Sequence, residues 1–228
     1  MNAVRLLPLI CFAAGLVHAA DAPGADQVTA AAKKLATQPN YSWKSTAVVP
    51  DSLPFKPGPT EGRTEKDGLT HLTMRTFGDN TTQVVIKGKQ RLLTDRDGAW
   101  LSVSDFENEE GPGRFMAMIA KGVQLPSDQV LELVAGAKEL KADGDAIGGE
   151  LTAEGLKKQF RMGEPKDPKG SVKFWLKDGS VTKYEIKVSA MMEFNGNEFD
   201  ASRTTTVEIK DVGVTKLEIP EQAKKKLQ

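Results

Sequence analysis

The chain has almost none of the side chains from which metal centres and nucleophilic catalytic sites are usually built. Its 228 residues include one cysteine, Cys11, and two histidines, His18 and His71. Cys11 and His18 both lie within the first twenty residues. Without that segment the chain keeps one imidazole and no thiol, too few groups for a zinc site of thiolate or imidazole ligands or for a Cys–His pair. Disulfides are excluded too, so an apolar core alone must stabilise the fold.

The first twenty residues have the pattern of an export signal. Arg5 gives a short positive start, residues 6–17 form an apolar run, and Ala19 and Ala20 are small residues suited to cleavage. An apolar run of about twelve residues is shorter than the roughly 20 that span a bilayer. We therefore predict a signal peptide over residues 1–20 and an exported protein, periplasmic or secreted, with no transmembrane segment after cleavage.

Neither sign of charge is in excess. The chain has 31 Lys and Arg and 31 Asp and Glu; loss of Arg5 leaves 30 against 31, a net charge of −1. No overall field attracts nucleic acid, which is not expected as a partner. Residues 21–228 suffice for one well-buried domain, and a single domain is predicted there.

A recurring two-residue turn dominates the remaining sequence. Asp-Gly and Asn-Gly pairs tolerate the positive φ angles of a tight hairpin, and most of these pairs are flanked by alternating or β-branched segments. Apolar and charged residues alternate in 172–177 and 183–190, which is typical of a sheet with one apolar and one solvated face. The sequence therefore predicts an antiparallel sheet. The turn pairs are Asp67-Gly68, Asp97-Gly98, Asp143-Gly144, Asp178-Gly179 and Asn195-Gly196.

Other strands, helices and connectors follow from local patterns. Proline-rich stretches 50–62 and 163–170 are predicted connectors. Section 114–160 is predicted to be largely helical. Further strands are expected at 41–49, 69–77, 82–89, 91–94, 99–103 and 202–211, and helices at 26–38 and 114–121, after the caps Ser127 and Thr152, and after Pro220.

This order of elements resembles the periplasmic lipoprotein-carrier superfamily, the LolA/LppX-like proteins. The resemblance implies an α+β fold in which a strongly curved antiparallel β-sheet, a half-barrel, wraps an apolar cavity and helices close one face. It covers most of residues 21–228, and the chain is more similar still to a group of exported bacterial proteins of unassigned activity. The residues that carry it are Tyr41-Ser42-Trp43, Asp97-Gly98-Ala99-Trp100-Leu101, Phe174–Gly179, Thr204–Ile209 and Leu217–Ala223.

No catalytic arrangement is recognisable in the sequence. A G-x-S-x-G elbow is lacking, and His71 lies in the middle of a predicted strand. The acidic residues of 105–110 and the pair Asp143 and Asp145 match no calcium-loop spacing, so they indicate solvated loops. We predict that the protein is not an enzyme and needs no metal and no cofactor.

Apolar side chains are better candidates for a functional role. Phe115, Met116, Met118 and Ile119 crowd one short predicted helix, where flexible methionine suits either an adaptable ligand surface or ordinary core packing. Trp43 and Trp100 likewise either line a cavity or fill the sheet. These six residues are the predicted cavity lining. Trp175 falls in register with lysines, so exposure there indicates a contact site or cover by a helix.

Two functions are compatible with these patterns. The first is a carrier that binds a hydrophobic ligand, a lipid or a lipoprotein acyl chain, in a half-barrel cavity, with lipid or an acylated protein as partner. The second is a cell-envelope protein-interaction module with a filled core and no ligand. An enclosed apolar cavity beneath residues 115–119 favours the carrier, and a solid core favours the module, so whether section 114–160 is lid or core separates the two.

Overall fold

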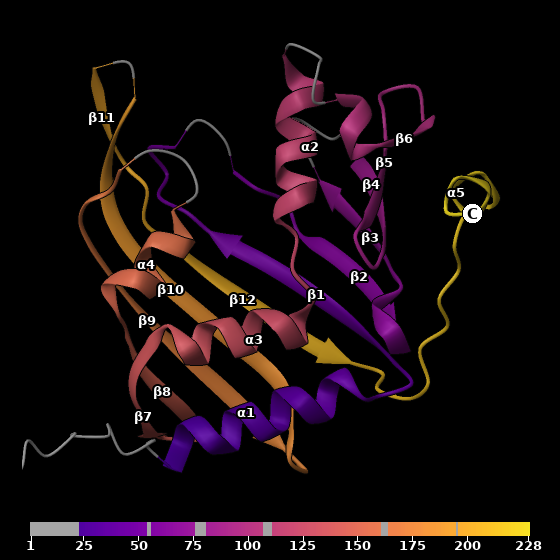
Figure 1. The fold of residues 1–228 in the computed structure, drawn as a ribbon. Coiled ribbons are helices and arrows are strands. Elements are labelled where there is room, and N and C mark those ends of the chain that lie inside the picture. The colour runs from indigo at the N-terminus through magenta and orange to yellow at the C-terminus, as the bar shows by residue number, and fades with distance from the viewer. Residues whose placement is uncertain (1–22, 54–55, 76–80, 107–110, 161–163, 195) are drawn as a thin grey trace, which may run out of the picture.

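The computed structural model describes residues 23–53, 56–75, 81–106, 111–160, 164–194 and 196–228. The predicted signal peptide lies outside these residues. One large sheet of twelve strands dominates the described part of the chain, with helices on both of its faces (Figure 1). No helix in this part is long and apolar enough to cross a membrane.

Every strand pairing in the sheet is antiparallel. The strands follow the order β6-β5-β4-β3-β2-β1-β12-β10-β9-β8-β7, and β11 pairs with β10. The sheet bends without closing, which confirms the predicted α+β half-barrel. The strands are β1 (Asn40–Val48), β2 (Thr60–Glu65), β3 (Thr70–Arg75), β4 (Thr81–Lys87), β5 (Gln90–Thr94), β6 (Trp100–Ser102), β7 (Ala137–Asp143), β8 (Ala146–Leu151), β9 (Lys166–Lys177), β10 (Ser180–Phe194), β11 (Asn197–Asp200) and β12 (Arg203–Lys210).

Four of the predicted hairpin turns are confirmed, because each of these pairs connects two neighbouring antiparallel strands. The fifth pair includes Asn195, which lies outside the described residues. Asp178 and Gly179 adopt φ angles of 52° and 69°. Asp67 and Gly68 have φ angles of 70° and 79° in the short 3-10 turn η1 (Lys66–Gly68). Two consecutive positive φ angles match the right-handed twist of the strands that such a turn joins.

Five helices accompany the sheet in the described residues, near the predicted positions. α1 and α3 lie together across the concave face (Figure 1). α2 lies beside β5, and α5 lies on the opposite face of that end of the sheet. The helices are α1 (Pro23–Ala36), α2 (Pro112–Gly122), α3 (Pro126–Ala135), α4 (Ala153–Gln159) and α5 (Glu221–Lys226), and a 3-10 turn, η2 (Val103–Phe106), precedes α2.

Three segment predictions were wrong. Section 114–160 contains the hairpin β7–β8 between α3 and α4, although β7 reads AKELKAD and is rich in helix-forming residues. The connector 50–62 ends in β2, and the connector 163–170 contains the start of β9. Pro168 is tolerated there because residues 166–170 pair only with β10, whose register shifts opposite it, between Ser189 and Met191.

The main core lies between the concave face and the helices. Phe174 and Tyr184 are buried there, while Lys173 and Lys183 point to the other face, as the alternation predicted. α1 is embedded in this core. Its Val28, Ala31, Ala32 and Leu35 are at most 1% exposed.

A second, smaller core lies on the convex face. Val84 and Val85 are consecutive residues of β4 and are both fully buried, so both faces of the sheet are covered here. Val85, Leu92 and Trp100 pack with Ile219, Ala223 and Leu227 of the C-terminal segment. At this end of the sheet, α5 therefore covers the convex face and α2 covers the concave face.

Candidate ligand-binding site on helix α2

The start and end of α2 are defined by local sequence. Gly111, at φ 93°, precedes Pro112 in the first turn, where proline is tolerated because the N–H that it lacks would have no helical partner there. The helix ends at Gly122, and the N–H of the next residue, Val123, donates to the carbonyl of Ala120. It packs on β5 and η2, so its support comes from one end of the half-barrel.

The two sides of α2 differ in residue size and burial. Ala117 and Ala120 are buried, at 2% and 0% exposure, and Met116 and Ile119 pack partly buried against the main core. Met118 is 43% exposed, one of a few large apolar side chains of the described residues that reach the solvent to this extent. Small alanines therefore hold the helix close to the protein, while a flexible methionine projects from it.

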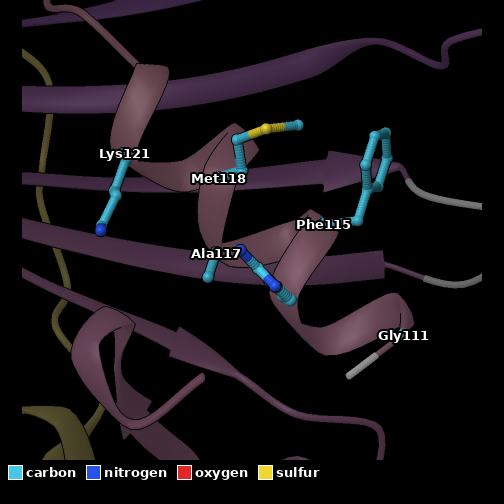
Figure 2. A pocket seen from close by; sticks show the side chains of 6 residues that line it. Gly111, Phe115, Ala117, Met118 and Lys121 are labelled. Carbon is cyan, nitrogen blue, oxygen red and sulfur yellow. The ribbon is translucent and has the colours of Figure 1, made fainter. Parts of the chain in front are cut away.

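The outer side of α2 borders an open pocket of about 570 Å³ (Figure 2). Phe115 and Met118 supply its apolar wall, and in the view they extend on the same side of the helix. Arg114 and Lys121 supply cationic groups. The remaining lining residues are Gly111 and Ala117.

The chemistry of this wall suits an apolar ligand of variable shape. A thioether on three rotatable bonds adapts to different partners, and a phenyl ring adds a rigid apolar surface. Every lining residue lies on α2 or directly before it, so this wall contacts a ligand from one side. In the described residues no group of three or more His, Cys, Asp and Glu side chains could hold a metal ion.

The six residues predicted as a cavity lining are divided among several places. Phe115 and Met118 line the α2 pocket, and Met116 and Ile119 turn towards the core. Trp43 and Trp100 are described below. The sequence reasoning missed Arg114 and Lys121, although the spacing 114, 118, 121 marks one stripe of a helix.

Trp43 and Trp100 are buried on opposite faces of the sheet. Trp43 lies in the main core, where its Nε1 donates to Thr64 Oγ1 at 3.1 Å and its ring covers Gly62. Trp100 lies in the convex core, with the ring of His71 edge-on at 6.3 Å. Neither lines the α2 pocket.

Tyr41 and Tyr184 are titratable groups buried in the main core. Burial raises the pKa of Tyr184 well above its ordinary value and also raises the pKa of Tyr41. Tyr184 donates from its hydroxyl to Gln129 Oε1 of α3 at 2.5 Å. Protonated Tyr184 therefore links α3 to the sheet, in the half of the concave face that α1 and α3 occupy.

Trp175 lies on the charged convex face, as the pattern predicted. Its Nε1 donates to Asp145 Oδ1 at 3.0 Å, and Lys183 Nζ lies 3.6 Å from its ring centroid. A cation over an indole face is favourable even near the surface. Trp175 is therefore half-buried between Asp145 of the β7–β8 turn and Lys183 of β10.

No protein-family model matches the chain, and no curated protein is similar to it in sequence. Solved structures with a similar arrangement include the lipoprotein LppX of Mycobacterium tuberculosis, with 8% identity, 85% of this chain and 96% of that chain covered, and a TM-score of 0.48. LprF of Mycobacterium bovis has 12% identity, 87% and 96% coverage and a TM-score of 0.45. A LolA superfamily protein of Nitrosomonas europaea has 9% identity, 86% and 96% coverage and a TM-score of 0.36.

These structures belong to the group that the sequence resembles, LolA/LppX-like proteins, and nearly their full length is covered. The likeness concerns the arrangement of the chain. Identities near one residue in ten carry no site residue from those proteins to this one, so the chemistry of the site has to be argued from the side chains of α2.

Proposed function

We propose that the protein binds or carries a hydrophobic ligand, of the class of a lipid or a lipoprotein acyl chain, on the open side of its half-barrel. The observation that carries the proposal is the apolar wall of the exposed Met118 and the half-buried Phe115 beside an open pocket. Burying this wall against a ligand removes apolar surface from water, which is favourable by about 25 cal/mol per Å².

The support of α2 suits a movable wall. Its buried contacts include Ala117 and Ala120, which contribute little apolar area, and its neighbours β5 and η2 belong to one end of the sheet. The deep core around α1 involves other elements, α3, β7 and β10. All six lining residues of the pocket lie on α2 or directly before it, so a shift of α2 moves the whole apolar wall together.

The proposal includes export and the absence of catalysis. An N-terminal segment with the pattern of a signal peptide supports export to the periplasm or out of the cell, where lipids and acylated proteins are available as ligands. Its one remaining histidine, His71, is engaged at both ring nitrogens: Nδ1 lies 2.8 Å from the carbonyl oxygen of Glu218, and Nε2 lies 2.9 Å from Gln83 Oε1.

A filled-core interaction module is the second candidate, and a specific observation favours it. α1 occupies the concave face with four side chains at or below 1% exposure, so this half of the half-barrel is solid. In that case the pocket on α2 is a surface recess, and a protein partner rather than a lipid would cover Met118.

Uptake of a neutral fluorescent lipid, such as a pyrene-labelled acylglycerol, tests the proposal. Saturable uptake should be lost in Met118→Asp, while the melting temperature stays near that of the wild type. Met191→Asp is the matched control, because Met191 on β10 is 41% exposed and does not line the pocket. Equal loss in both variants, or no saturable uptake by the wild type of any neutral lipid, would overturn the carrier in favour of the module.

A further inference from the structure

A second and larger groove lies at the other end of the sheet, where β8 is shorter than β9 and leaves part of β9 without a partner on that side. The ladder between β8 and β9 runs from Ile147 to Glu150, and the chain then turns into α4. Residues 166–170 of β9 therefore have β10 on one side and no strand of the described part of the chain on the other. The groove at this notch has a volume of about 1070 Å³.

The inner wall of the groove is apolar. Leu151, Leu156 and Phe160 line it, and each is at most 8% exposed. Gly170 lets them approach the strand, because a Cβ at this position would lie 2.9 Å from Leu156 Cδ2 and 3.1 Å from Leu151 Cδ1. Pro165 and Pro168 extend the apolar surface towards solvent.

The outer rim of the groove is cationic. Lys138, Lys157, Lys169 and Lys187 line it against two carboxylates, Glu150 and Glu164. Lys157 forms an ion pair with Glu154 at 3.1 Å, whereas Lys169 and Lys187 have no ion pair with a described residue. The groove therefore has a net positive rim next to an apolar wall.

Strand register places two of these lysines beside two serines. Lys169 pairs with Ser189, and Ser171 pairs with Lys187, so the four side chains alternate on one face of the sheet. Diagonal neighbours on such a face lie roughly 7–8 Å apart, within reach of long side chains. These four side chains share the convex face with Lys173 and Lys183, whereas the apolar wall belongs to the main core on the concave side, so the two meet at the notch where β8 ends. Ammonium and hydroxyl groups are donors that suit a phosphate or carboxylate.

We propose that this groove binds an amphiphile with an anionic head group, its acyl chain against Leu151, Leu156 and Phe160 and its head group at Lys169 and Lys187. Charge complementarity selects the occupant, because apolar wall and cationic rim meet at one notch. Head-group recognition and chain burial should contribute together, so neither an inorganic anion nor a neutral amphiphile should bind as well.

Isothermal titration of the purified exported protein with dodecyl phosphate, below its micelle-forming concentration, tests the proposal. Wild-type protein should bind it at least tenfold more tightly than dodecyl maltoside and show no heat with inorganic phosphate. Lys169→Gln with Lys187→Gln should weaken dodecyl phosphate binding about tenfold or more and leave dodecyl maltoside binding unchanged. Lys89→Gln with Lys225→Gln is the matched control, since it removes two exposed charges elsewhere and should bind dodecyl phosphate like the wild type.

Chain length and the α2 variant separate this groove from the pocket on α2. Octyl phosphate should bind much more weakly than dodecyl phosphate, because each buried methylene contributes about a fourfold factor. Met118→Asp should retain dodecyl phosphate binding even though it loses the neutral lipid. Unchanged dodecyl phosphate binding in the Lys169 and Lys187 double variant would overturn the groove as the anionic site. Loss of dodecyl phosphate binding in Met118→Asp would overturn it as well. Neither result affects the proposal for neutral lipids.

Discussion

His71 Nδ1 lies 2.8 Å from the carbonyl oxygen of Glu218, a contact between residues 147 positions apart in the sequence. His71 is on the convex side of β3, and Glu218 precedes Ile219, the residue with which the C-terminal segment enters the convex core. This contact and the packing of α5 fasten the end of the chain over Val85, Leu92 and Trp100.

His71→Ala should loosen the C-terminal segment. Loss of its hydrogen bonds should cost about 1–2 kcal/mol of the free energy of unfolding. Hydrogen exchange at the amides of α5 should become faster, while exchange at α1 stays unchanged. Equal acceleration in both helices would show that His71 supports the whole domain and not the C-terminal segment in particular.

Stability should fall at alkaline pH because of Tyr184. Burial raises the pKa of this phenol well above 10.0, so in the folded protein it stays protonated, while in the unfolded chain it ionises near pH 10. Its contribution is therefore fully present below pH 10 and is lost as the pH rises above that value. Urea denaturation between pH 8 and 11 should show this loss.

Tyr184→Phe is the control for the alkaline effect, because lysines also titrate in this range. The variant should be less stable at pH 8, since Gln129 loses the hydroxyl that donates to it. Its stability should, however, decline less steeply above pH 10 than that of the wild type. A parallel decline would assign the alkaline loss to other groups.

Gly62→Ala should destabilise the protein through Trp43. A Cβ at position 62 would lie 2.2 Å from Cε2 of the indole, which no small adjustment relieves. We expect a cost of about 3 kcal/mol, at the upper end for overpacked cores. Gly62→Ala combined with Trp43→Leu should be more stable than the sum of the two single changes predicts, as measured by urea denaturation; additive effects would contradict direct contact as the cause.

A charge should be tolerated at Met118 and not at Ala120. Met118 is 43% exposed, so Met118→Asp should change the free energy of unfolding by less than about 1 kcal/mol. Ala120 is fully buried, and Ala120→Asp should cost several kcal/mol or prevent folding. Thermal melts of both variants measure the difference. A large loss at Met118 would show that this side of α2 is part of the core.

The exported protein should begin at Ala20 or Asp21. The short apolar run followed by small residues is the reason. Intact-mass analysis of the protein recovered from outside the cytoplasm measures the cleavage site directly. Retention of residues 1–20 would contradict the prediction.

Local chemistry determined much of the fold. The Asp-Gly and Asn-Gly turns and the alternation in β9 and β10 depend on single-residue φ preferences and on a two-residue period, both of which are written in the sequence. The strands β2 and β7 were missed, because their residues, TEGRTE and AKELKAD, have weak strand preference of their own. They are strands because neighbouring strands supply their hydrogen-bond partners.

The candidate sites depended more on tertiary structure. The sequence identified the apolar helix of Phe115 and Met118, yet only packing decided that Met116 turns inwards and Met118 outwards. Trp43 and Trp100 looked equivalent in the sequence, and the sheet separates them onto opposite faces. The lysine-rimmed groove has no sequence signature, because residues from separate parts of the chain form it: Lys138, several residues of 150–160, several of 164–171, and Lys187 with Ser189. Residue type determines which contacts a side chain can make, whereas strand register and the end of β8 determine which side chains meet.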